Sequence, residues 1–206
     1  MTNVQISIID YGAGNVHSVA KALEFLGAKP LITNNVEEIQ KADALILPGQ
    51  GACAPAMKSI DQSGLTDVIT RVINEGKPFL GICVGLQVLF DTSQEGEIQC
   101  FGIVPGRIKL LPPGLKIPHM GWNKVHIQSK HPIFDDVPQD SYFYFVHSYY
   151  PDPLDPNITA ATTEYGFEFC CVIARDNLVA TQFHPEKSGV WGLKLYENFL
   201  RFAAGR

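Results

Sequence analysis

The sequence has little of what marks membrane, secreted or nucleic-acid-binding proteins. Charged residues make up 18% of it and the formal net charge is −5. It therefore lacks the positive excess that neutralises phosphates, and we expect no nucleic-acid partner. No apolar run approaches the roughly 18 residues of a membrane span. Residues 1–10 lack the basic and apolar regions of a secretory signal. We therefore expect a cytoplasmic protein with no membrane partner.

Cysteine pairs with metal-ligand or redox spacing are also missing. The chain has 5 cysteines, and none stands in a C-x-x-C arrangement, which argues against a zinc site or a redox pair. In a reducing compartment, an isolated cysteine is either a small core residue or a reactive thiol. We expect no bound metal.

What is present is the pattern of an α/β protein. Short apolar runs alternate with helical periodicity through the first 90 residues, which is typical of a parallel sheet covered on both faces. Strands are expected at 6–10, 29–33, 44–48 and 78–82, and helices at 16–26, 36–42, 65–75 and 84–90. The second half predicts strands at 103–111, 122–128, 142–150 and 158–163, a hairpin over 169–183, and a final helix at 190–202.

No linker or internal repeat divides the chain. We therefore predict an α/β fold in a single domain, residues 1–206. Its central, mostly parallel sheet is flanked by helices, and antiparallel strands are added in the C-terminal half.

A candidate nucleophile lies between an expected strand and an expected helix. Cys83 stands in Gly-Ile-Cys-Val-Gly, residues 81–85. This is the cysteine form of the strand-turn-helix elbow that presents a nucleophile. The helix that follows favours a thiolate, and its first N–H groups can face an oxyanion. The alternative is a buried structural cysteine, as we interpret the other four cysteines.

A candidate base follows the last expected strand. His184 precedes Pro185, which favours an extended backbone at the histidine. Residues i and i+2 of an extended chain face the same side, so Glu186 can reach the imidazole and orient it. The alternative is a surface turn with a solvent-facing histidine.

A glycine-containing loop follows the third expected strand. It consists of Pro48-Gly49-Gln50-Gly51. Glycines on both sides of Gln50 allow a peptide N–H to turn towards the nucleophile as a second oxyanion donor beside Val84 N–H. An ordinary turn is the alternative.

Five segments together resemble a known family. They are GICVGLQ at 81–87, FHPEK at 183–187, DYGAGN at 10–15, PHMGWN at 118–123 and YFVHSY at 144–149. The chain is similar to the class I, triad-type glutamine amidotransferases. Within them it resembles the glutaminase subunits of imidazole glycerol phosphate synthases.

The resemblance implies an activity and a partner. The activity is hydrolysis of L-glutamine by a Cys83–His184–Glu186 triad without a cofactor. The partner is a (β/α)₈-barrel cyclase subunit, which receives the ammonia within a heterodimer of histidine biosynthesis. By the same resemblance, residues that hold the substrate's amino-acid end are Gln87, Glu95, Tyr144, His147, Ser148 and Tyr149. Those placed on the cyclase-facing surface are Asn15, Trp122 and Lys187.

Other functions remain open on the sequence. One is another amidotransferase of the same class, such as the glutaminase of pyridoxal phosphate synthase, against which the motif at 118–123 argues. A second is a cysteine peptidase or γ-glutamyl hydrolase that acts alone. A third is a binding module whose site has lapsed, against which the complete Cys-His-Glu set argues.

Overall fold

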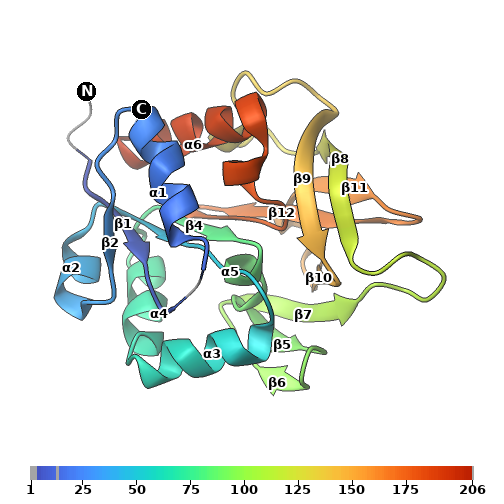
Figure 1. Ribbon diagram of the computed structural model, residues 1–206, viewed down its shortest axis with the longest axis horizontal. Coiled ribbons are helices and arrows are strands. Elements are labelled where there is room, and N and C mark those ends of the chain that lie inside the picture. The colour runs from blue at the N-terminus through green and yellow to red at the C-terminus, as the bar shows by residue number, and fades with distance from the viewer. Residues whose placement is uncertain (1–3, 13, 206) are drawn as a thin grey trace.

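A computed structural model describes residues 4–12 and 14–205 of the chain. Over these residues, a nine-stranded mixed sheet forms the centre of the molecule, with strand order β2-β1-β3-β4-β13-β12-β11-β8-β9 (Figure 1). Its parallel half consists of β2 (Leu31–Thr33), β1 (Ile6–Ile9), β3 (Ala44–Leu47), β4 (Phe79–Ile82) and β13 (Leu178–Thr181). Its antiparallel half consists of β12 (Glu168–Arg175), β11 (Thr159–Glu164), β8 (His119–Ile127) and β9 (Ser141–His147).

Helices cover both faces of the parallel half. Helices α1 and α6 lie over one face, and α3 and α4 lie over the other (Figure 1). The helices are α1 (Val16–Phe25), α2 (Val36–Lys41), α3 (Cys53–Gln62), α4 (Thr66–Asn74), α5 (Val84–Gln87) and α6 (Gly189–Ala203). Because both faces are covered, β1, β3, β4 and β13 are buried at every position. Single 3₁₀ turns occur at Pro132–Phe134, Pro156–Ile158 and Pro185–Lys187.

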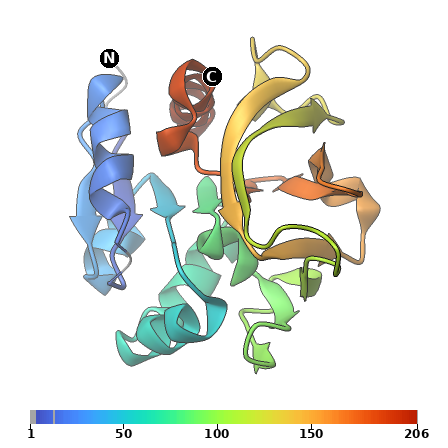
Figure 2. The same cartoon turned by 45° about the vertical axis from the view of Figure 1, so that its right-hand side comes forward.

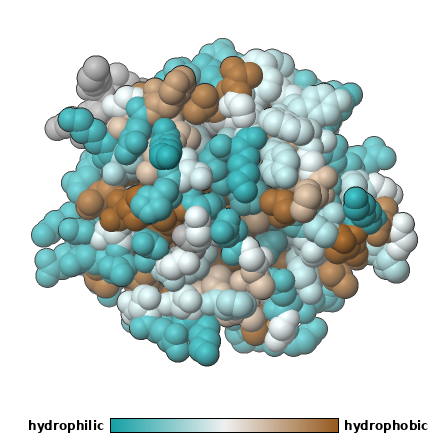
Figure 3. Space-filling model, in the orientation of Figure 1, coloured by the Kyte–Doolittle hydropathy of each residue, from teal (hydrophilic) through white to brown (hydrophobic). Residues whose placement is uncertain are grey.

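A second, smaller sheet lies beside α5. Its strands are β10 (Tyr149–Pro153), β7 (Val104–Leu110), β5 (Phe90–Ser93) and β6 (Ile98–Gln99). Figure 2 shows β8 and β9 as a strongly curved ribbon above this sheet. The exterior in the view of Figure 3 is mostly hydrophilic, with its apolar side chains in several separate groups. No described helix is long and apolar enough to cross a membrane.

The structure corrects two expected elements and adds a helix that was not expected. The helix expected at 84–90 ends at Gln87, and Phe90 already begins β5. The strand expected at 142–150 is two strands in different sheets, which separate at Ser148. Helix α3 was not expected; its Pro55 lies in the first turn, where the missing N–H of proline costs no hydrogen bond.

The order of the parallel strands brings four chain segments to one edge. β1, β3, β4 and β13 are consecutive in the sheet, and their registers pair Ile8 with Ile46, Leu47 with Gly81, and Ile82 with Thr181. The loops that leave their carboxyl ends therefore begin side by side. Ligands of open α/β sheets bind at this edge.

Candidate active site

Cys83 occupies a strained turn between β4 and α5. Its backbone has φ 54° and ψ −106°, a region that residues with a side chain rarely adopt. The flanking glycines are required by close packing. A Cβ on Gly81 would lie 2.8 Å from the Gly85 carbonyl oxygen, and one on Gly85 would overlap the Leu47 carbonyl. The structure thus contains the tight strand-to-helix turn that the motif predicts, with the cysteine at its apex.

The imidazole of His184 and the carboxylate of Glu186 are paired and buried. Nδ1 of His184 donates to Oε1 of Glu186 at 2.8 Å, and the side chains are 1% and 0% exposed. The backbone at His184 is extended, with φ −101° and ψ 100°, as the following proline favours. Its N–H donates to the Tyr144 carbonyl at 3.0 Å. These contacts leave Nε2 as the free nitrogen, buried and without a hydrogen-bond partner among the described residues.

Charge coupling links His184 to Cys83. Burial alone would lower the pKa of His184, but the interaction with the nearby Cys83 and the hydrogen bond and charge of Glu186 outweigh it and raise the pKa to about 10. The pKa of Glu186 is lowered: burial would raise it, but the hydrogen bond and charge of His184, followed by the hydrogen bond from Asn15, prevail. The site therefore favours an imidazolium at His184 beside the Glu186 carboxylate.

A buried glutamine, Gln182, also contacts the nucleophile. Its Nε2 lies 3.6 Å from Sγ of Cys83, and its Oε1 accepts from Nε2 of Gln87 at 3.1 Å. Gln87 Nε2 also donates to the Tyr149 carbonyl at 3.1 Å. Sequence reasoning missed Gln182, although it lies two residues before His184, the spacing that places both side chains on one side of an extended segment.

A cavity of about 810 Å³ opens beside this cluster. Five of the six expected substrate-binding residues line it, together with His184: Gln87, Glu95, His147, Ser148 and Tyr149. Glu95 is oriented by the backbone N–H of Cys53, which donates to its Oε2 at 2.6 Å. Tyr144 is the exception. Its side chain packs edge-on against Trp122, 6.0 Å between ring centroids, and only its backbone reaches the site.

The glycine loop after β3 packs directly on the elbow. A Cβ on Gly49 would lie 2.8 Å from Cβ of Val84, 3.0 Å from the Gly85 nitrogen and 2.6 Å from the Tyr11 hydroxyl. Gly51 has φ +90° and is exposed, and the Gln50 side chain lies against Gly14. The loop expected to supply oxyanion donors therefore does adjoin the nucleophile.

Tyr11 is a further residue that the sequence did not single out. It lines the cavity, yet its hydroxyl is buried and has no partner among the described residues. Burial, followed by the charges of Cys83 and Cys53, raises its pKa, so the hydroxyl stays protonated. The motif at 10–15 contained it, but no spacing rule distinguished it from a core aromatic; Ala13 of that motif lies outside the described residues.

The three residues expected on the partner-facing surface differ in exposure. Trp122 is 55% exposed, and Lys187 is exposed at the cavity. The expectation for Asn15 is corrected, because that residue is 3% exposed and its Nδ2 donates to Oε1 of Glu186 at 3.0 Å. Asn15 lies inside the site.

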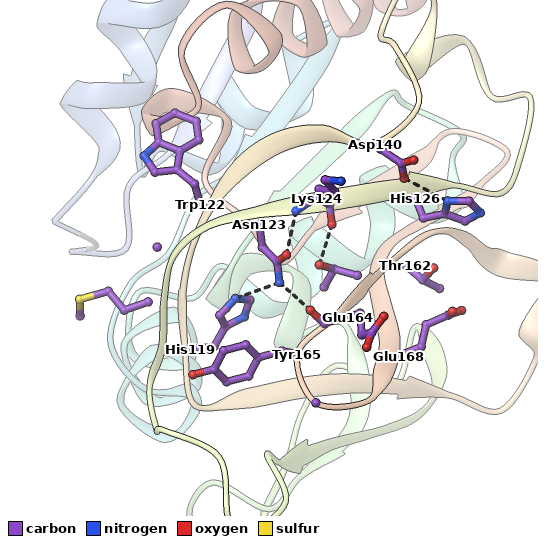
Figure 4. A pocket seen from close by; sticks show the side chains of 14 residues that line it. His119, Trp122, Asn123, Lys124, His126, Asp140, Thr162, Glu164, Tyr165 and Glu168 are labelled. Atoms are coloured by element: carbon purple, nitrogen blue, oxygen red, sulfur yellow. Dashed lines mark hydrogen bonds and ion pairs between the residues drawn. The ribbon is translucent and has the colours of Figure 1, made fainter.

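A second cavity, of about 630 Å³, lies in the curve of β8 (Figure 4), and paired side chains connect its lining residue His119 with His147 of the first cavity. Nδ1 of His147 lies 2.9 Å from the Tyr149 carbonyl oxygen. Nε2 of His147 lies 2.9 Å from Nδ1 of His119. His119 Nε2 lies 3.3 Å from the amide nitrogen of Asn123. If each link is satisfied, Asn123 donates to His119, His119 to His147, and His147 to the carbonyl, so both imidazoles are neutral.

The neutral histidines predict acid sensitivity. Burial lowers the pKa of His119 from 6.5 to about 4, and burial with the neighbouring His119 lowers that of His147 to about 3. Between these values and 6.5 the unfolded chain binds more protons than the folded one, so the free energy of unfolding falls as pH drops from 7 to 4. The raised pKa of His184 acts in another window, from 6.5 to about 10, where stability falls as pH rises.

Urea unfolding at pH 7 and pH 5 measures this effect. His119→Phe keeps an aromatic ring in the stack with Tyr165. Between pH 7 and pH 5, its free energy of unfolding is expected to fall less than that of the original chain. His126→Asn is the control, because the His126 side chain is 57% exposed, and its drop should equal that of the original chain. An unchanged drop in His119→Phe contradicts the interpretation.

Comparison with known proteins fits this geometry. Residues 7–202 match the family described as glutamine amidotransferase class-I. The chain belongs to the class I glutamine amidotransferases. A protein of Dehalococcoides mccartyi named imidazole glycerol phosphate synthase subunit HisH is 51% identical over 201 residues, covering 97% of this chain and 98% of that protein. One of the same name from Synechococcus sp. (strain JA-3-3Ab) is 48% identical over 210 residues, with 100% and 97% covered.

Solved structures agree with the amidotransferase fold. A crystal structure of a glutamine amidotransferase superposes with a TM-score of 0.76 at 19% identity, covering 98% of this chain and 99% of the other. A structure of PurLQS from Thermotoga maritima gives 0.75 at 17% identity, with 97% and 98% covered. At these identities the likeness concerns the fold, so the chemistry of this amidotransferase is inferred from its own residues.

Proposed function

We propose that this chain is the glutaminase subunit of an imidazole glycerol phosphate synthase. It hydrolyses L-glutamine to glutamate and ammonia through a thioester on Cys83. The observation that supports the proposal is that His184, which lines the cavity, pairs with Glu186 two residues on and interacts with Cys83, 101 residues earlier in the sequence. The relatives at about half identity are named as subunits of that synthase.

The first half of the reaction forms the thioester. The Cys83 thiolate attacks the side-chain amide carbon of glutamine, making a carbon–sulfur bond and moving the carbonyl electrons onto oxygen. Backbone N–H groups of Val84 and the loop Gly49–Gly51 hold this oxyanion, as the contact of Gly49 with the elbow allows. When the electrons return, the carbon–nitrogen bond breaks and Nε2–H of His184 protonates the leaving nitrogen, releasing ammonia.

The second half restores the thiolate. Neutral His184 takes a proton from water, the hydroxide attacks the thioester carbon, and the carbon–sulfur bond breaks to give glutamate. Glu186 holds Nδ1–H throughout, which keeps Nε2 directed at the reacting atoms and stabilises the imidazolium. Nε2 is unpaired among the described residues, so its contact with the sulfur is expected to tighten when glutamine fills the cavity.

Residues of the cavity suit the amino-acid end of glutamine. Glu95 offers a carboxylate to the ammonium group, and its Oε1 is not engaged by the Cys53 N–H that holds Oε2. The loop at Ser148 and Tyr149, where the chain passes from one sheet to the other, offers backbone groups to the carboxylate. Gln87 and His147 are held by hydrogen bonds to the Tyr149 carbonyl and act by fixing this loop.

The partner in this proposal is a (β/α)₈-barrel cyclase that receives the ammonia. Three groups at the surface support a docking face: the Trp122 ring, 55% exposed, the Met120 thioether side chain, 61% exposed, and the Lys187 ammonium at the cavity. Burying a tryptophan and a methionine is typical of the centre of a protein interface. We also propose that docking turns the Gly49–Gly51 loop into its oxyanion-binding orientation, which limits wasteful hydrolysis.

Glutamate release tests the proposal. The chain is mixed with a barrel cyclase and the cyclase's nucleotide substrate, and hydrolysis of glutamine is followed with and without the partner. We expect hydrolysis that is stimulated by the complex, and weaker stimulation with Trp122→Ala. A chain that hydrolyses glutamine equally fast alone contradicts the coupling, and one that hydrolyses none in the complex contradicts the function.

A further inference from the structure

Asn15 is placed as a helix cap but does not act as one. It occupies the N-cap of α1, a position where an asparagine side chain ordinarily accepts from the first free N–H groups. Here the backbone has φ −105° and ψ 6°, and the side chain makes no capping hydrogen bond. Asn35, at the N-cap of α2, shows the ordinary arrangement in the same chain: its Oδ1 accepts from Glu37 and Glu38 N–H.

The side chain of Asn15 is used at the triad instead. Its Nδ2 donates to Oε1 of Glu186 at 3.0 Å, the same oxygen that accepts from Nδ1 of His184 at 2.8 Å. The other oxygen, Oε2, accepts from the Tyr196 hydroxyl at 3.4 Å. Three donors from α1, from the segment after β13 and from α6 therefore surround a fully buried carboxylate. Together they fix both its position and the plane of the carboxyl group.

We infer that Asn15 is a positioning residue for the reaction: it fixes the Glu186 carboxylate, and through it the imidazole of His184. The inference rests on the proposed function. A packing role explains the side chain poorly, because Oδ1 of Asn15 is buried without a partner among the described residues, a cost that an apolar residue would avoid. A capping role is excluded by the missing capping bond. What remains is the donor directed at Glu186.

The two replacements Asn15→Ala and Asn15→Asp separate these roles. Aspartate has the same shape and caps helices as well as asparagine does, so a packing or capping role predicts that it is the milder change. If Asn15 acts as a hydrogen-bond donor to Glu186, aspartate is the more damaging replacement. Alanine only removes the hydrogen bond, whereas aspartate puts a second carboxylate against Glu186, and two adjacent carboxylates resist shared ionisation.

The assay is glutamine hydrolysis by the complex with the barrel cyclase, measured as kcat and KM across pH. We expect kcat about 10- to 100-fold lower for Asn15→Ala, as for loss of a hydrogen bond to a charged group, and lower still for Asn15→Asp, with KM little changed. The acid limb of the kcat profile should move to higher pH in both, because Glu186 loses a donor that favours its charged form. The titratable groups that face Glu186 in the original chain are His184 and Tyr196, and both remain.

Asn35→Asp is the matched control, since it changes the cap of α2 in the same way far from the triad, and should leave the whole profile unchanged. Urea unfolding of each variant distinguishes a loss of folded protein from a loss of catalysis in the folded protein. The inference is overturned if Asn15→Asp retains the original kcat, if the acid limb stays in place in both variants, or if lost activity matches the lost folded fraction. Absence of hydrolysis by the original complex would instead refute the proposed function.

Discussion

Replacing Cys83 by alanine is expected to abolish glutamine hydrolysis, lowering kcat by at least about 10⁴-fold, because no other nucleophile can form the thioester. The other cysteine near the cavity, Cys53, cannot substitute: its Sγ donates to Oε1 of Gln87 at 3.3 Å, and the interaction with Cys100, followed by burial, raises its pKa. Glutamate release by the complex with the barrel cyclase is the measurement.

The matched measurement uses added ammonia. Synthesis by the cyclase from ammonium salt should proceed at the original rate in the Cys83→Ala complex, because the partner's site does not use the thiol. Cys53→Ala is the control variant and should keep glutamine hydrolysis within a few-fold of the original. Hydrolysis that survives in Cys83→Ala, or is lost only in Cys53→Ala, refutes the assignment of the nucleophile.

Replacing Glu186 by glutamine is expected to lower kcat by up to about 10⁴-fold with little change in KM. Glutamine keeps the shape but can present an N–H to Nδ1, which favours the tautomer whose Nε2 carries the proton and cannot accept one from the thiol. The carboxylate is among the groups that raise the pKa of His184 to about 10. Its loss should therefore also lower that pKa and weaken the activation of the Cys83 thiol by the imidazole.

The rate of alkylation of Cys83 as a function of pH measures how far this activation is lost. Iodoacetamide should react with the original chain at neutral pH faster than with Glu186→Gln, and the variant should need a higher pH for the same rate. Glu97→Gln, at an exposed position away from the triad, is the control. Equal rates and equal kcat for Glu186→Gln would show that the carboxylate does not orient the imidazole.

The parallel half of the fold could be predicted from the sequence because its strands are buried on both faces. Continuous apolar runs such as residues 44–47 and 79–82 leave few other interpretations, and Gly27, with φ +83°, ends α1 as expected. The break at Ser148 could not be predicted, since β9 and β10 form one unbroken strand-like stretch. The stretch is divided because its first part pairs in the nine-stranded sheet and its second part pairs in the smaller sheet.

The candidate site shows the same contrast. The contact of His184 with Glu186 follows from local rules, because proline sets the backbone and the two residues are two apart. Asn15 pairs with a residue 171 positions away, and no local pattern indicates such a contact. Family resemblance placed it on the surface, whereas the packing of α1 against α6 and the 3₁₀ turn Pro185–Lys187 buries it. Tyr11 was missed for the same reason, since its role depends on which strands are neighbours, whereas the spacing of Gln182 from His184 was a local signal that was overlooked.

Covalent labelling by a diazoketone analogue of glutamine tests the central claim most directly. The reagent needs a glutamine-shaped site, a reactive thiolate and a proton donor at one point, so peptide mass spectrometry of the labelled complex reports on all three. We predict a single adduct on Cys83, prevented by excess glutamine and formed at least tenfold more slowly in His184→Ala. An adduct on another cysteine, or labelling of Cys83 at an undiminished rate without His184, would contradict the account.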